Sequence, residues 1–324
     1  LLAHEMAHQW FGDKVTCGSY RDVWLSEGFA TYLQGMTVQQ FFPADWHSWL
    51  KARITSVAGQ SGGSVWVEDT TNVARIYSGR LSYNKASYLL HMLRWMIGDS
   101  VFFEACRNYL EDPKTSYGFA RTSDLQHKLE EASGLDLTEF FADWFTGQGY
   151  PSYTIDWYQL QDSVSVGIHQ AQSHPAVNFF EMPLPVWLYH NGIPEKLVLP
   201  NSHQDQLFMQ YVGDVVIDSL VFDPELWILS VNNKVRHLST ATHDITSSDE
   251  IHFYPNPANQ EIRIINLPPT ADVMLIDLQG RQYQLKEYNG LSIDLSSFAD
   301  GLYWLKVTGP KAALLLTAPI LILH

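Results

Sequence analysis

This chain of 324 residues is poor in cysteine, in basic residues and in long apolar runs. Its two cysteines, Cys17 and Cys106, are too few for a disulfide framework, so we expect two free thiols. Lys and Arg number 20 against 35 Asp and Glu, a net charge of −15, whereas nucleic-acid binders carry basic patches; we expect no nucleic-acid partner. The apolar run 312–324 is shorter than the roughly 20 residues that span a bilayer. Pro319 also interrupts it, so we expect no transmembrane segment.

The chain is rich in apolar and aromatic side chains. Hydrophobic residues make up 46% of it and aromatic residues 13%, including 11 Trp. This is the composition of a folded globular protein. A length of 324 residues predicts two or three domains.

The first half of the chain has helical periodicity. Up to about Gly149, apolar residues recur at three- and four-residue steps. Ser123 is a candidate N-cap and Gly134 a candidate helix stop. The expected helices span residues 25–40, 82–97, 101–110, 123–132 and 137–146.

From Ser152 onward the period changes to two, which is typical of strands. We expect a β-sandwich domain over residues 152–233, a polar linker over 234–249, and an Ig-like β-sandwich over 250–324. The strands expected in the first sandwich are 153–161, 164–170, 184–189, 195–199, 215–221 and 226–231. The predicted fold class is therefore multidomain α+β.

The most informative feature is the pair His4 and His8, with Glu5 between them and Glu27 after eighteen intervening residues. On a helix, His4 and His8 lie one turn apart on one face and can reach a single tetrahedral zinc ion. Glu27 can add a third ligand from a second helix and leave a fourth position open, which distinguishes a catalytic zinc site. Glu5 follows His4 by one residue on the same helix, where its side chain can contact a metal-bound water rather than the metal. We expect one Zn²⁺ per chain.

Three segments around these residues resemble the gluzincin aminopeptidases of the M1 family. They are QWFGD at 9–13, WLSEGFA at 24–30 and YNKA at 83–86. Ser26 stands where the family usually has Asn, and Ala86 where it usually has Gly. The resemblance covers residues 1–151 and implies the C-terminal, mainly α-helical half of a thermolysin-like zincin catalytic domain.

The resemblance also implies a mechanism. Glu5 would act as the general base toward the attacking water and later pass the proton to the leaving amine. Tyr83 would donate a hydrogen bond to the developing oxyanion, an effect worth about 3 kcal/mol. The implied activity is that of a zinc-dependent aminopeptidase, which removes N-terminal residues from peptides.

Five other charged residues are weaker candidates. Asp13 and Asp22 are candidates for accepting the second N–H of a zinc-binding histidine. A solvated loop charge is the favoured interpretation of Asp13, while Asp22 stays open. Arg75, Arg80 and Lys85 are candidates for binding a substrate carboxylate, although nothing in the sequence ranks them above surface charges.

The chain begins at or inside the expected zinc helix. Members of the resembled family carry an upstream Gly-x-Met-Glu-Asn segment, whose Glu binds the free α-amino group of the substrate, and this segment is absent here. We therefore expect a fragment of a longer protein, and we attribute the lack of a signal peptide to the same cause.

The third unit carries a second resemblance. Three short segments resemble the C-terminal sorting domain of type IX secretion cargo from Bacteroidetes. They are Tyr-Pro-Asn-Pro at 254–257, Asp-Leu-Gln-Gly-Arg at 277–281 and Gly-Leu-Tyr at 301–303. This implies the type IX secretion machinery as a partner, beside peptide substrates, and a secreted or cell-surface location. The apolar run 312–324 departs from the basic residue that usually ends such domains.

Two other functions stay open. A secreted surface or binding protein could keep the zincin shell without turnover, and zinc retention with no rate on aminoacyl or peptidyl substrates would favour it. Glu5 and Tyr83, both intact, favour an enzyme instead. Another gluzincin activity, epoxide hydrolysis, shares the same ligands, and a comparison of epoxide with peptide substrates would separate the two enzymes.

Overall fold

The structure is a computed structural model that describes residues 1–238, 251–256, 258–268, 270–277, 280–285, 288–289, 292–309, 314–322 and 324. The chain forms two compact units, Leu1–Thr240 and Ala241–His324. Both helices and sheets are present, as expected. Within the described ranges, no helix combines the length and apolarity that crossing a membrane requires.

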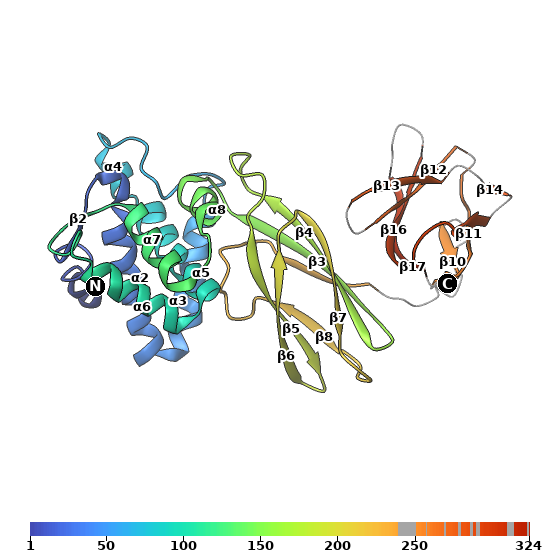
Figure 1. The fold of residues 1–324 in the computed structure, drawn as a ribbon, viewed down its shortest axis with the longest axis horizontal. Coiled ribbons are helices and arrows are strands. Elements are labelled where there is room, and N and C mark those ends of the chain that lie inside the picture. The colour runs from blue at the N-terminus through green and yellow to red at the C-terminus, as the bar shows by residue number, and fades with distance from the viewer. Residues whose placement is uncertain are drawn as a thin grey trace. The chain divides into compact units, whose positions relative to one another are not determined.

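The first part of unit 1 is helical and includes one small parallel sheet, β1 with β2 (Figure 1). Its elements are α1 (Leu2–Ala7), β1 (Val15–Cys17), the 3₁₀ turn η1 (Tyr20–Asp22), α2 (Trp24–Phe41), α3 (Pro43–Ala58), α4 (Val73–Ile76), the π-helix η2 (Gly79–Lys85), α5 (Ala86–Ile97), α6 (Asp99–Glu111), β2 (Gly118–Ala120), α7 (Thr122–Ser133), α8 (Thr138–Phe140) and the π-helix η3 (Phe141–Thr146).

Local signals account for both ends of α7. The backbone N–H of Arg121 donates to the Asp124 carboxylate at 2.7 Å, which satisfies a donor at the helix start. The expected N-cap, Ser123, lies inside the helix, so that prediction is wrong by two residues. Gly134 ends the helix with φ +72°, a left-handed conformation that suits glycine, and the predicted stop is confirmed.

Helix α3 is not among the expected helices. Its buried residues Leu50, Ile54 and Val57 nevertheless follow helical spacing, and Pro43 occupies the first helical turn. Between α2 and α3, Gly35 makes room for Trp49, because a Cβ at Gly35 would overlap the Trp49 indole. This close approach brings α3 against the helix that carries Glu27.

The second part of unit 1 is a pair of sheets that share one core. One sheet has the order β7-β4-β3-β9 and the other β6-β5-β8. Buried side chains from both sheets, such as Val166 and Val186, belong to the same hydrophobic core. The strands are β3 (Pro151–Leu160), β4 (Ser163–Gln172), β5 (Met182–His190), β6 (Ile193–Asn201), β7 (Asp205–Tyr211), β8 (Ser219–Phe222) and β9 (Lys234–His237).

Two predictions in this region are wrong. Residues 226–231 do not form a strand, because the Asp223 carboxylate accepts hydrogen bonds from the backbone N–H groups of Trp227 and Ile228 and holds the chain in a turn. The expected linker 234–249 begins with strand β9, which pairs in parallel with β3. Residues 239–249 of that linker lie outside the described residues.

The helices and the sheets of unit 1 are packed together. The indole N–H of Trp95 on α5 donates to the carbonyl of Pro183 on β5 at 2.7 Å. The rings of Trp144 and Phe180 lie 4.5 Å apart. The apolar cores of the two parts are therefore continuous.

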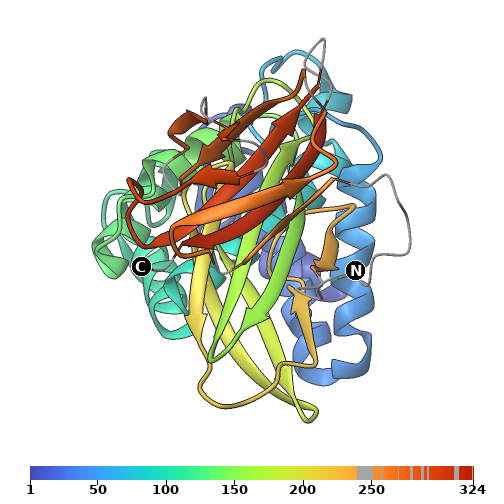
Figure 2. The same ribbon diagram turned by 90° about the vertical axis from the view of Figure 1, so that its right-hand side faces the viewer.

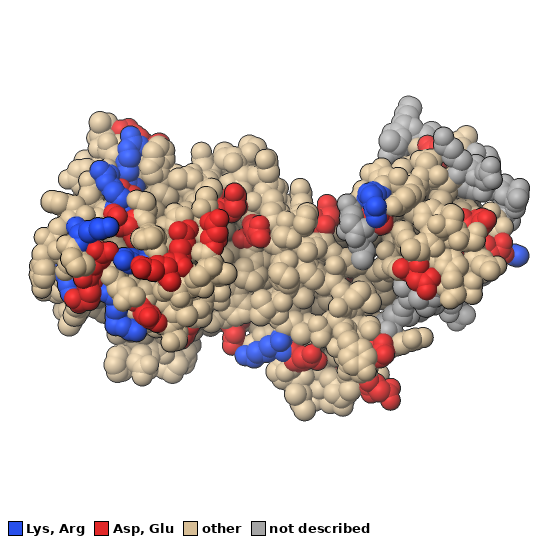
Figure 3. Space-filling model, viewed as in Figure 1, with Lys and Arg blue, Asp and Glu red and all other residues tan. Residues whose placement is uncertain are grey.

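Ion pairs join basic and acidic side chains on the helical part. Lys14 pairs with Glu111 at 2.6 Å, and Lys128 with both Asp112 and Glu131 at 3.0 Å. On the face drawn in Figure 3, the basic side chains of this part lie among acidic ones. Their charge is therefore locally neutralised.

The described residues of unit 2 form two four-stranded sheets, β10-β11-β15-β14 and β13-β12-β16-β17, drawn in orange and red in Figures 1 and 2. Their inward side chains, such as Ile262 and Leu305, share one core. The apolar end of the chain forms β17, antiparallel to β16. The strands are β10 (His252–Tyr254), β11 (Glu261–Ile265), β12 (Asp272–Ile276), β13 (Gln282–Leu285), β14 (Tyr288–Asn289), β15 (Ser292–Asp294), β16 (Gly301–Thr308) and β17 (Leu314–Ile322).

Candidate metal and catalytic site

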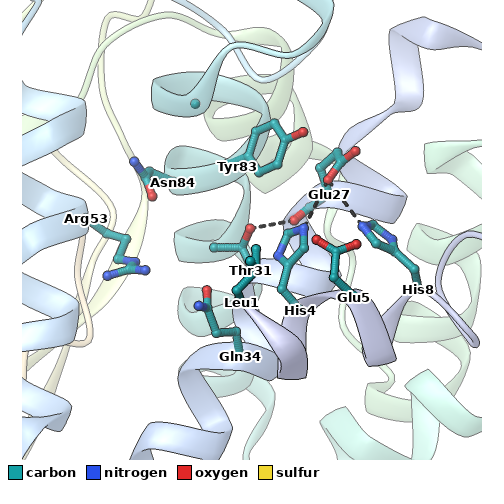
Figure 4. A pocket seen from close by; sticks show the side chains of 11 residues that line it. Leu1, His4, Glu5, His8, Glu27, Thr31, Gln34, Arg53, Tyr83 and Asn84 are labelled. Atoms are coloured by element: carbon teal, nitrogen blue, oxygen red, sulfur yellow. Dashed lines mark hydrogen bonds and ion pairs between the residues drawn. The ribbon is translucent and has the colours of Figure 1, made fainter.

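Helices α1 and α2 bring His4, His8 and Glu27 together. The Nε2 atoms of His4 and His8 lie 3.3 Å and 3.4 Å from Oε2 of Glu27. One ligand atom from each of the three residues falls within 4.8 Å of the others (Figure 4). Two imidazole nitrogens and one carboxylate oxygen at this spacing could hold a tetrahedral divalent ion such as zinc.

The orientation of His8 depends on the turn that follows α1. Its Nδ1 lies 3.1 Å from the carbonyl oxygen of Phe11, a contact that orients Nε2 toward Glu27. Gly12 has φ +145°, and a Cβ there would lie 3.1 Å from the His8 carbonyl oxygen and 3.3 Å from Nδ1. The glycine therefore provides both the backbone conformation and the space that this histidine needs.

Glu27 is fixed by the first turns of α2. Its carbonyl accepts a hydrogen bond from the Thr31 hydroxyl at 2.7 Å. Just before the helix, the buried Asp22 carboxylate accepts hydrogen bonds from the backbone N–H and the hydroxyl of Thr122, at 3.1 Å and 2.7 Å, and pairs with Arg121. Asp22, left open between two roles by the sequence, thus anchors the start of α2 to α7.

A close helix contact sets the distance between α2 and the segment that carries Tyr83. A Cβ on Gly28 would lie 2.8 Å from the Ala86 Cβ, which is too close for two carbon atoms. Only glycine at position 28 permits this approach while Ala86 stands in the partner helix. Ala86 stands where the resembled family usually has Gly. Its methyl group fits here because Gly28, which faces it, has no side chain.

Tyr83 lies on the π-helix η2, beside the histidine pair. Its ring is stacked on His4 with a centroid distance of 5.9 Å and an interplanar angle of 14°. Burial, together with the nearby Glu27 charge, raises the pKa of the Tyr83 phenol above its ordinary value. The phenol is therefore protonated at neutral pH and can donate a hydrogen bond.

The five residues singled out by the sequence, His4, Glu5, His8, Glu27 and Tyr83, all line one pocket of about 570 Å³. Figure 4 shows the Glu5 carboxylate between the two histidine rings. The pocket is also lined by residues that were not predicted to belong to the site: Leu1, Thr31, Gln34, Arg53, Gly79 and Asn84.

The three basic residues considered for a substrate carboxylate have other contacts. Arg75 pairs with Glu68 and donates to two backbone carbonyls, and Arg80 donates to the carbonyls of Val57 and Gly62. Lys85 is buried, with Nζ 3.0 Å from the carbonyl oxygen of Gly63. None of the three lines the pocket that contains His4 and Glu27.

Residues 1–144 match the peptidase family M1 domain, and residues 252–315 match a secretion system C-terminal sorting domain. The leucyl aminopeptidase of Saccharolobus solfataricus is 34% identical over 160 residues, 47% of this chain and 20% of the relative. Aminopeptidase N of Lactobacillus delbrueckii subsp. lactis is 32% identical over 160 residues, 47% of this chain and 19% of the relative.

Among solved structures, aminopeptidase A of Legionella pneumophila, determined in complex with aspartic acid, has a similar fold. The TM-score is 0.56 at 20% identity, and the match covers 73% of this chain and 26% of that one. The chain spans about a fifth of the length of the curated relatives it matches. These matches confirm both predicted resemblances, to the M1 peptidases over residues 1–144 and to a secretion sorting domain over residues 252–315.

Proposed function

We propose that this chain belongs to a secreted, zinc-dependent aminopeptidase. The observation that carries the proposal is the convergence of His4, His8 and Glu27, with Glu5 and Tyr83 in the same pocket. The two curated relatives described above are named aminopeptidases, which supports the reaction class. We take residues 1–151 as the catalytic part and residues 152–233 as a domain that follows it.

In this proposal His4, His8 and Glu27 hold one zinc ion. Their donor set of two nitrogens and one oxygen suits zinc and leaves a coordination position for water or substrate. A bound zinc ion would supply Lewis-acid activation of water and of the scissile carbonyl.

Glu5 and Tyr83 perform the proton transfer and the charge stabilisation. Glu5 has no ligand role and takes the proton from the attacking water, then gives it to the departing amine. The Tyr83 phenol donates a hydrogen bond to the carbonyl oxygen as negative charge develops on it. The Phe11 carbonyl keeps His8 in its orientation throughout.

Unit 2 links the enzyme to export. A C-terminal sorting domain directs a chain to the type IX secretion machinery, so we propose a secreted or surface-attached bacterial peptidase. Peptides are its proposed substrates.

The test is metal content by elemental analysis, measured together with turnover of an aminoacyl anilide. We expect one zinc per chain. Glu5→Gln should keep the zinc and lose turnover by about 10²- to 10⁴-fold, because only the proton transfer is removed. His8→Ala should lose both. A wild-type rate in Glu5→Gln, or equal zinc content in His8→Ala and wild type, would refute the assignment.

A further inference from the structure

The pocket also contains a positively charged side chain, on the side opposite the proposed metal ligands. Arg53 on α3 is the one Lys or Arg among the described residues that line it. Figure 4 shows Arg53 extending into the pocket from α3, on the side opposite Glu5 and His8. Glu5 and Glu27 place acidic groups at one end of the pocket and Arg53 places a cation at the other.

The Arg53 guanidinium has little to bind within the protein. One of its N–H donors reaches the Trp49 carbonyl at 3.2 Å, one turn back on the same helix. Its Nε is buried and has no hydrogen-bond partner in the part of the chain that the structure describes. No Asp or Glu among those residues forms an ion pair with it, whereas Arg75 and Arg94 each pair with a carboxylate. A guanidinium has five donors, so most of them are available to a ligand.

Contacts with neighbouring aromatic residues hold the Arg53 side chain in its position. Its guanidinium carbon lies 3.8 Å from the centroid of the Trp49 ring, a cation–π contact that limits its rotamers. Trp49 in turn is held by the close approach at Gly35 and by stacking on Trp46 at 5.2 Å. Burial lowers the pKa of Arg53 to about 10, so the side chain stays cationic at neutral pH. The protein thus holds an unneutralised cation against a pocket wall.

We propose that Arg53 binds a carboxylate of the substrate, so that the pocket favours peptides with a negative charge near the cleaved residue. The inference rests on the proposed function, since it concerns the same pocket. Arginine and carboxylate form charge-assisted, often bidentate hydrogen bonds, which a neutral amide cannot reproduce. The carboxylate has two sources, the C-terminus of a short peptide or an acidic side chain.

Binding tests the inference separately from turnover. The affinities of Leu-Leu and Leu-Leu-amide are measured by calorimetry on the full chain carrying Glu5→Gln, with and without zinc. We expect the acid to bind about 10- to 100-fold more tightly than the amide. Arg53→Gln should reduce this ratio to about one, and Arg53→Lys should keep part of it. Lys51→Gln, which removes an exposed cation two residues away on α3, should leave the ratio unchanged.

A second pair of ligands identifies the source of the carboxylate. Glu-anilide and Gln-anilide have nearly the same shape and differ by one charge. An Arg53-dependent preference for Glu over Gln assigns the side chain, and one for Leu-Leu over its amide assigns the C-terminus.

Each failure has its own signature. Acid-to-amide and Glu-to-Gln ratios that Arg53→Gln leaves unchanged in the Glu5→Gln chain would overturn the inference, even if the wild type turns over a neutral anilide normally. An Arg53-dependent ratio in a chain with no turnover would leave the carboxylate site standing and reject the proposed function.

Discussion

Helix α1 and the continuous segment η2–α5 deliver side chains to the same pocket but differ in how the protein holds them. Helix α1 buries only Ala7, and its Leu2 and Met6 are 75% and 54% exposed. In the other segment, which carries Tyr83, every residue of Ala86–Arg94 is buried. One side of the pocket is anchored in the core, while the other depends on a short helix and the turn after it.

The difference indicates where ligand binding matters most. Local stability follows the number of buried apolar contacts, so in this chain we expect α1 to open more readily than α5. An isolated helix of six residues is also too short to be stable by itself. We call α1 and the turn after it the weak side of the pocket and the core-anchored segment η2–α5 its strong side. A metal ion held between α1 and α2 would therefore link the weak side to the packed part of the protein.

The largest expected effect is that of zinc on α1. At a free concentration about 1,000 times its Kd, zinc should raise the free energy of unfolding by about 4 kcal/mol. Amide hydrogen exchange with and without zinc should show the gain concentrated in Leu2–His8, with little change in α5. In His8→Ala the gain should disappear. Equal protection of α1 in both conditions would mean that its rigidity does not come from the metal.

The next effect concerns the contact that joins the two sides. Gly28→Ala places a methyl group 2.8 Å from the Ala86 Cβ and should lower the free energy of unfolding by about 1–3 kcal/mol, as measured in urea. The double variant with Ala86→Gly removes the clash. A double-mutant cycle should therefore give a favourable coupling between the two positions. Strict additivity would show that the helices separate without strain.

The same comparison explains what the sequence could predict. His4 and His8 follow from spacing on one helix, which is a local property, and Glu27 follows from the motif spacing that this sequence shares with zinc hydrolases. The role of Tyr83 was predicted from the resemblance of its segment to a family motif. The structure places the Tyr83 ring beside His4, and its catalytic role stays a prediction.

Arg53 could not be predicted in this way. In the sequence, nothing distinguishes Arg53 from the nearby Lys51. The direction of the Arg53 side chain depends on the packing of α3 on α2 at Gly35, and periodicity does not predict such a contact between helices. The turn at Asp223 was missed for a related reason, because its carboxylate bonds to backbone N–H groups override the apolar alternation of residues 226–231.

A third prediction concerns Gly12, on the weak side of the pocket. Gly12→Ala strains a backbone with φ +145° and crowds the His8 ring, so zinc affinity should fall about 10- to 100-fold. Gly98→Ala is the matched control, since Gly98 also has a positive φ (+80°) but has open space around its Cβ position. Competition with a chromogenic chelator measures both. An equal loss of zinc affinity in the two variants would point to general strain rather than to the orientation of His8.

The smallest expected effect, counted per pH unit, lies on the strong side, at Lys85. Burial, with help from Arg80 and Arg75, lowers the pKa of Lys85 from 10.5 to about 7. Between these two values the unfolded chain keeps the proton that the folded chain has lost, so stability should rise with pH across this window. The slope should reach at most about 1.4 kcal/mol per pH unit.

Urea unfolding between pH 7 and 10 measures this slope. Other groups titrate in the same range, so the informative quantity is the difference between wild type and Lys85→Met, in which the contribution of Lys85 is removed. Lys51→Met, an exposed lysine on α3, should retain the wild-type slope. Parallel curves for wild type and Lys85→Met would mean that Lys85 stays protonated in the fold. The carbonyls of Gly63 and Gly147, which its ammonium group contacts, would then stabilise the charge more than burial opposes it.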